Sequence, residues 1–296
     1  MSIDPTNNKV RLRPTARAGV AFLLSVPLAG CALLGGGERP MSAEANAQEQ
    51  AQVCAQLPEA AASPATATAL LKGEVVPVNP LSQNSPLRDW EHLSFFPFKL
   101  PTQYSVMQCG ADNKRQLVRI DARSSASSMI RPLNLQAGPD SRIRWKWWIA
   151  KPNTKAKTLD RSLEDSPIRV VLAFEGDRSR LSEQDQQFLQ RMDMLTRKPA
   201  PYATLMYSLG AGVAQYDVIT SAHTHTVKIK AVQTQQDRNG LGQWRLFDRN
   251  IEEDFVKAFG EKPGRLLSVA IMGDADNTKA SSRAYITDLE LIGLKE

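Results

Sequence analysis

Alternation of apolar and polar side chains with a period of two restricts the fold of this chain more than any other feature of its sequence. In residues 142–150, one face carries two isoleucines and two tryptophans, Ile143, Trp145, Trp147 and Ile149. Successive side chains of a strand point to opposite faces, so this pattern predicts a strand with one face in a core. Comparable segments occupy residues 117–123, 168–174, 227–231 and 284–292, and the almost wholly apolar residues 266–272 are typical of a central strand. Together they predict an all-β fold, a two-sheet β-sandwich.

Two short helices are expected between the strands. Ser182 is a candidate N-cap for a helix that Pro199 ends. Asn250, followed three residues later by Glu253, resembles a capping box, and Gly260 suits the left-handed position after a second helix. We expect both helices to cover sheet edges or one end of the sandwich.

The N-terminal segment has the pattern of a bacterial lipoprotein signal peptide. Arginines precede a short apolar run that ends in Leu28-Ala29-Gly30-Cys31, an apolar residue, two small residues and a cysteine. The run is too short to span a bilayer, so we expect residues 1–30 to be cleaved and Cys31 to carry the lipid. An uncleaved membrane anchor is the alternative. Ala32 stands where many inner-membrane lipoproteins carry Asp, which favours the outer membrane, facing the periplasm.

The rest of the chain divides into a tether and a domain. Residues 31–80 comprise the lipidated cysteine and a flexible tether, within which residues 43–57 favour a helix with a thin apolar face. Residues 81–296 contain the predicted strands and form the β-sandwich domain. Cys54 and Cys109 either form a disulfide, which an oxidising compartment favours, or are two separate thiols.

Charge and motifs exclude some classes of function. The formal net charge is +6 over 296 residues, but Lys and Arg are scattered without a long basic block, so we expect no binding to nucleic acid. The sequence has no nucleophile-elbow, zinc-protease, phosphate-loop or dinucleotide motif. A catalytic function is therefore less favoured than a binding function.

Several short sequence motifs of this chain occur together in one bacterial family. They are Trp145-Lys146-Trp147, the run at 201–207, the run at 244–260 and Asp274-Ala275-Asp276-Asn277-Thr278. In combination they make the chain similar to the bacterial domain of unknown function 3047 family, over about residues 90–292. The resemblance implies a jelly-roll sandwich of the galactose-binding or carbohydrate-module type and assigns no activity. The chain departs from the family pattern at residues 208–209 and 234–236.

Asp274, Asp276 and Asn277 are the candidate metal ligands. Two carboxylates and an amide in one tight loop offer the hard oxygen atoms that calcium prefers, so a structural calcium ion is one interpretation. The downstream acidic residue of an EF-hand is absent. The other interpretation is a turn in which these side chains bond to their own backbone.

The candidate ligand-binding residues are aromatic rings and arginines within strand-like segments. Trp145 and Trp147 share the apolar face, so we expect them in the core, whereas Trp148 lies on the opposite face and is a candidate exposed platform for a sugar ring. The other candidates for a binding cleft are Tyr207, Trp244, Arg169 and Arg249. Half-buried packing of the rings and structural salt bridges of the arginines are the alternatives.

These features predict a lipid-anchored envelope protein with a non-catalytic binding domain for a glycan or another envelope component. Two other functions stay open. One is an enzyme acting on envelope polysaccharide, with Asp274 or Asp276 as the catalytic residue. The other is an accessory lipoprotein that binds a protein partner. Fold analogy alone does not decide between them.

Overall fold

The computed structural model describes residues 41–59, 67–69, 89–94, 98–110 and 115–296. Cys31, the signal-peptide segment and part of the expected tether lie outside the described residues. None of the helices described is both long and apolar enough to cross a bilayer.

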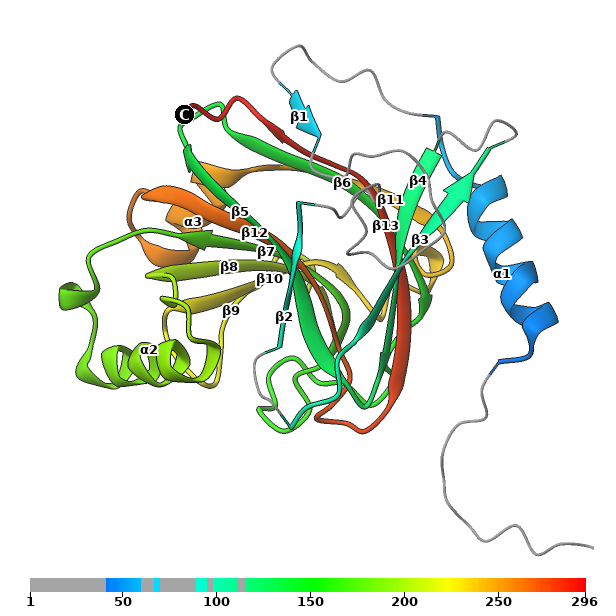
Figure 1. Cartoon of the computed structure of the whole chain (residues 1–296), viewed down its shortest axis with the longest axis horizontal. Coiled ribbons are helices and arrows are strands. Elements are labelled where there is room, and N and C mark those ends of the chain that lie inside the picture. The colour runs from blue at the N-terminus through cyan, green and yellow to red at the C-terminus, as the bar shows by residue number, and fades with distance from the viewer. Residues whose placement is uncertain (1–40, 60–66, 70–88, 95–97, 111–114) are drawn as a thin grey trace, which may run out of the picture. The chain divides into compact units, whose positions relative to one another are not determined.

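The strands form two sheets that pack as a sandwich, and their course can be followed in Figure 1. The first sheet has the order β11-β6-β13-β4-β3, with β1 also paired to β13. Its strands are β1 (Ala67–Ala69), β3 (Gln103–Cys109), β4 (Arg115–Arg123), β6 (Arg142–Lys151), β11 (Trp244–Asn250) and β13 (Ser281–Ile292). Every pairing described within it is antiparallel.

The second sheet has the order β2-β5-β12-β7-β8-β10-β9. Its strands are β2 (Glu91–Leu93), β5 (Ala126–Gln136), β7 (Ser166–Phe174), β8 (Ala203–Gly210), β9 (Val218–Thr220), β10 (Val227–Thr234) and β12 (Arg265–Asp274). β8 and β10 run parallel, and the other pairings described in this sheet are antiparallel. The helices are α1 (Ala43–Ala55), α2 (Glu183–Thr196) and α3 (Ile251–Phe259), with short 3-10 turns at Arg178–Arg180 and Arg238–Gly240. The predicted two-sheet β-sandwich of jelly-roll type is therefore confirmed.

An aromatic cluster from β6, β8 and β11 occupies the core between the sheets. Trp145 and Trp147 are fully buried, as their shared face predicts. The rings of Phe247 and Tyr207 each lie 5.1 Å from that of Trp145, measured between centroids. Trp147 Nε1 donates a hydrogen bond of 2.7 Å to Gln233 Oε1, so burial of this indole leaves no polar atom unpaired.

Helices α2 and α3 begin and end as the sequence predicts. The Ser182 hydroxyl accepts a hydrogen bond of 3.2 Å from the backbone N–H of Asp185. The Asn250 side chain accepts one of 2.9 Å from the N–H of Glu253. Gly260 follows α3 with a φ of 78°, which a glycine adopts without the steric cost that a side chain imposes.

Strand β10 places a lysine in the interior. Lys230 is 1% exposed, and its Nζ lies 3.1 Å from Asp254 Oδ1 on α3. Arg249 binds both oxygens of the same carboxylate, at 2.9 and 2.6 Å. Two cations therefore share one buried acid, which offsets the cost of removing Lys230 from water. Alternation in this strand predicts that its lysines share a face but not that α3 covers one of them.

Helix α1 packs on the outer face of the first sheet, although it belongs to the segment expected to be a tether. Cys54 of α1 forms a disulfide with Cys109 of β3, and Figure 1 shows the helix beside that strand. Val53 is fully buried in an apolar cluster with Trp148 and Tyr285. Residues of the 31–80 segment are thus part of the folded domain.

Candidate functional site

Trp148 and Trp244, two of the predicted ligand-binding residues, lie beneath α1. Trp148 is 2% exposed, and its ring meets that of Trp244 edge-on at 6.0 Å. Trp244 Nε1 donates to the backbone carbonyl of Val53 at 2.9 Å. The prediction that Trp148 is an exposed platform is therefore wrong. The alternation of side chains along β6 correctly places this ring on the outer face of the sheet, but helix α1 covers that face.

Tyr207 and Arg249, two further candidates, lie near the same acid, Asp254, Tyr207 in the core and Arg249 half-buried. Tyr207 is fully buried, and burial, together with the nearby charge of Asp254, raises the pKa of its hydroxyl well above the usual value. Arg249 is held by its bidentate pair with Asp254 and lies over the ring of Tyr216 at 5.3 Å. The ligand role expected of Tyr207 is wrong because no solvent reaches it. Arg249 makes the structural salt bridge that the sequence left as its alternative.

Arg169, the last of these candidates, belongs to a buried acidic cluster. It is 4% exposed, with Nη1 at 3.2 Å from Asp274 Oδ2 and Nη2 donating to the carbonyl of Glu164 at 2.9 Å. It too makes a structural salt bridge, so none of the five residues predicted to bind a ligand lies in a shared cleft.

The acidic cluster consists of Asp165, Asp274 and Asp276. Asp165 directly precedes β7, and Asp274 ends β12, which is the neighbouring strand. One carboxylate oxygen of each residue lies within 4.8 Å of those of the other two. All three residues are at least 93% buried. The cluster therefore concentrates three acids at one end of the second sheet, in the arrangement that a hard cation would need.

Hydrogen bonds fix the positions of these carboxylates. Asp165 Oδ2 accepts from the backbone N–H of Thr278 at 2.8 Å, from the Thr278 hydroxyl at 2.6 Å and from Asn153 Nδ2 at 3.3 Å. Lys99 Nζ lies 2.6 Å from Asp276 Oδ2. The cluster thus joins the β6–β7 connection to the β12–β13 connection.

Asn277, expected to be the third metal ligand, is not a member of the cluster. Its side chain is exposed, and only its backbone N–H reaches in, to Asp165 Oδ1 at 3.3 Å. Asp165 occupies the third position instead. The sequence motif does not include Asp165, because 109 residues separate it from Asp274 and only the pairing of β7 with β12 brings the two together.

The pKa values of two of the three acids are shifted in opposite directions. Burial raises the pKa of Asp274 well above its usual value; the charge of Arg169 opposes this effect, and the carboxylates of Asp276 and Asp165 add to it. For Asp276, burial is outweighed by hydrogen bonds with Asp274 and Lys99, so its pKa is lowered. The pair therefore holds a negative charge on Asp276 and disfavours a second one on Asp274.

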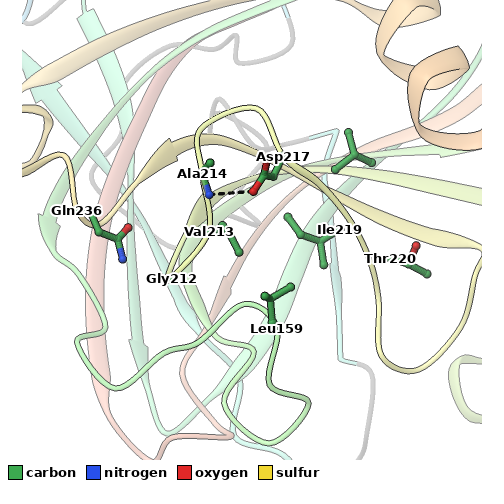
Figure 2. Close-up of a pocket in the computed structure, with 9 residues that line it drawn as sticks. Leu159, Gly212, Val213, Ala214, Asp217, Ile219, Thr220 and Gln236 are labelled. Atoms are coloured by element: carbon green, nitrogen blue, oxygen red, sulfur yellow. Dashed lines mark hydrogen bonds between the residues drawn. The ribbon is translucent and has the colours of Figure 1, made fainter.

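A separate open hollow of about 760 Å³ lies against the edge strand β9 (Figure 2). Its lining combines aliphatic with polar side chains: Leu159, Gly212, Val213, Ala214, Asp217, Val218, Ile219, Thr220 and Gln236. Asp217 Oδ2 accepts a hydrogen bond of 2.9 Å from the N–H of Ala214, which closes the turn at one side of the hollow. No motif signals this site, because its residues come from strand β9 and from three separate connections of the chain.

Comparison with known proteins identifies a family. The family described as protein of unknown function DUF3047 matches residues 88–290 of the chain. This is the family that the sequence motifs indicated. No curated protein matches the chain.

Several solved structures are similar at low sequence identity. Endoglucanase 3 of family GH12 from Trichoderma harzianum is 6% identical with a TM-score of 0.35, and the match covers 70% of this chain and 98% of that one. The xyloglucanase domain of NopAA from Sinorhizobium fredii is 8% identical with a TM-score of 0.33, covering 70% and 93%. The family 11 carbohydrate-binding module of Lic26A-Cel5E from Clostridium thermocellum is 11% identical with a TM-score of 0.28, covering 70% and 96%. Similarity at this level carries no functional argument.

Proposed function

The chain belongs to the DUF3047 family, and we propose that its β-sandwich is a non-catalytic module that binds a glycan in the hollow beside β9. The single observation that supports this function is the composition of the hollow. Its volume of about 760 Å³ is in the range of small-ligand sites. A sugar presents an apolar C–H face and hydroxyl groups at its edge, and the lining offers aliphatic side chains together with polar ones.

The lining supports binding without turnover. Glycosidases use two carboxyl groups on opposite sides of the scissile bond, roughly 5–10 Å apart. Asp217 is the one carboxylate among the nine residues that line the hollow, and one of its oxygens is already used in the turn. Asp274 and Asp276 do not offer a second catalytic centre, because they are buried and lie against each other. An enzyme acting on envelope polysaccharide is therefore the weaker alternative.

Glycan binding is tested with the full chain and two substitutions in the hollow. We expect Leu159→Ser and Gln236→Ala each to weaken the affinity for a bound glycan about tenfold, the effect of losing roughly 1.4 kcal/mol of contact. Leu246→Ser is the matched control, since Leu246 is also exposed but lies on β11 in the other sheet. Binding is measured by calorimetry after a screen of bacterial envelope glycans.

Two results would contradict this proposal. One is the absence of affinity for every glycan in the screen; crosslinking in cells would then test for a protein partner. The other is an equal loss of affinity in all three variants, which would place the glycan elsewhere or indicate a general defect.

We further propose that the protein is anchored in the outer membrane by lipid on Cys31 and faces the periplasm. The four residues ending at Cys31 support the lipid anchor, and Ala32 after them favours the outer membrane. The Cys54–Cys109 disulfide suits an oxidising compartment. The test is metabolic labelling of cells with a palmitate analogue. The native chain should incorporate the label and fractionate with outer membranes, whereas Cys31→Ser should not incorporate it. An unlabelled native chain would overturn the anchor without affecting the glycan proposal.

A further inference from the structure

The buried acidic cluster has an oxygen atom that no donor satisfies. Asp274 is 6% exposed, and its Oδ2 pairs with Arg169 at 3.2 Å. Its Oδ1 is buried and receives no hydrogen bond from an N–H or a hydroxyl group of any described residue. A buried acceptor without a partner is costly, so such atoms in a folded protein point to a proton, a water or an ion that completes them.

The charges around this atom do not balance. When all three are ionised, Asp165, Asp274 and Asp276 bring three negative charges together, whereas the cations that pair with them in the described part of the chain are Arg169 and Lys99. Glu164 lies beside Arg169 at 3.7 Å and adds to the negative side. Buried carboxylates in excess of their counter-charges are stable only if a proton or a further cation joins them.

From this geometry we propose that Asp165, Asp274 and Asp276 together bind one divalent cation, and that this cation is calcium. All the donor atoms are carboxylate oxygens, which hard cations prefer over soft ones. They lie within 4.8 Å of one another. Calcium accepts irregular sets of oxygen ligands at about 2.4 Å, whereas magnesium requires near-ideal octahedral geometry at about 2.1 Å, so three carboxylates already held by other bonds suit calcium better.

The cation would link two connections of the sandwich to each other. Asp165 ends the β6–β7 connection, Asp274 ends β12, and Asp276 lies in the β12–β13 connection that follows. The same β6–β7 connection carries Leu159, which lines the hollow. Calcium binding at the cluster does not require the proposed glycan function, because its readouts are metal binding and thermal stability.

The experiment uses the full chain after removal of metal with EDTA. We expect calorimetry to show one calcium ion bound per chain. We expect the Tm to rise by about 5–10 °C at a calcium concentration 100 times the Kd, as ligand linkage gives for a domain of this size. Magnesium at the same concentration should produce a smaller shift. No heat of binding and no shift with calcium would overturn the proposal.

Two variants locate the ion. Asp276→Asn keeps the size of a side chain that lies at the Lys99 edge of the cluster, and we expect it to bind calcium at least tenfold more weakly and to lose the Tm shift. Asp160→Asn is the matched control, because Asp160 is partly exposed in the same β6–β7 connection and its carboxylate accepts hydrogen bonds within its own turn, from Ser162. Unchanged calcium affinity in a folded Asp276→Asn protein would place the ion elsewhere and refute this site. If that variant does not fold, the wild-type calcium and EDTA measurements still decide the question.

Discussion

The indole Nε1 of Trp244 donates a hydrogen bond of 2.9 Å to the carbonyl oxygen of Val53, which joins the first sheet to helix α1. Val53 is the buried residue of this helix, whose remaining side chains are exposed or half-buried. Close by, Glu49 accepts hydrogen bonds from Arg283 and Tyr285. Because its apolar contact with the sheet is small, α1 depends on these polar contacts and on the adjacent disulfide.

Removing the disulfide should release α1 from the sheet. We expect the double substitution Cys54→Ser and Cys109→Ser to lower the free energy of unfolding by about 2–4 kcal/mol, because the bond closes a loop of 55 residues in the unfolded chain. Urea denaturation measures this loss. The freed helix should also be cleaved by protease within residues 41–59, and the fluorescence of Trp148 and Trp244 should shift to the red.

Glu44→Gln provides the control for this prediction, since Glu44 is exposed on the same helix. It should leave the protease pattern and the fluorescence unchanged. Protection of α1 in the cysteine-free protein would show that the polar contacts alone hold the helix in place.

The α1 region shows what period and composition can and cannot predict. Alternation in β6 correctly separates Trp145 and Trp147 from Trp148, and the Ala-rich composition of residues 43–57 correctly favours a helix. Neither pattern indicates that this helix covers the face on which Trp148 lies. Docking depends on a disulfide and on hydrogen bonds between residues far apart in the sequence, and these leave no periodic signal.

Asp254 should be the most sensitive position in the buried ion network. Asp254→Asn leaves the fully buried Lys230 without a counter-charge, so we expect a loss of about 3–5 kcal/mol in the free energy of unfolding. Lys230→Met should cost less, because Arg249 continues to bind both oxygens of Asp254 and the methionine fills a similar volume. Urea denaturation of the two variants compares them directly.

Lys262→Met is the control for these substitutions, since Lys262 is 80% exposed by side chain and pairs at the surface with Glu252. It should change the free energy of unfolding by less than about 1 kcal/mol. Equal losses for Asp254→Asn and Lys230→Met would contradict the idea that Arg249 compensates.

The acidic cluster was only partly predictable for a related reason. Asp274 and Asp276 are separated by a single residue in one sequence motif, so the sequence indicates them as a pair. Asp165 joins them through the antiparallel pairing of β7 and β12, which a single sequence does not reveal. The hollow beside β9 was not predictable at all, because its lining is assembled from β9 and from connections that share no motif.

Asp185 links the start of α2 to the segment before β10. Its carboxylate accepts hydrogen bonds from the hydroxyl of Thr224 at 2.6 Å and the backbone N–H of His225 at 2.9 Å, and lies 3.2 Å from His225 Nδ1. Burial alone would raise the pKa of Asp185, but the hydrogen bonds from Thr224, Ser182 and His225 outweigh it and lower the pKa to about 2. The ionised carboxylate is therefore the form that the folded protein stabilises.

This depressed pKa predicts a stability change in acid. A group whose pKa is lowered by folding stabilises the protein above its unfolded pKa, here about 3.8, and the contribution is lost as the pH falls through the folded value of about 2. Asp185→Asn should therefore be less stable than the native chain at pH 7, and the difference should shrink between about pH 4 and pH 2. Urea denaturation across this range measures it, with Glu183→Gln, exposed in the same helical turn, as the control that shows no such convergence. A difference that stays constant down to pH 2 would mean that the hydrogen bonds to Asp185 do not favour its ionised form.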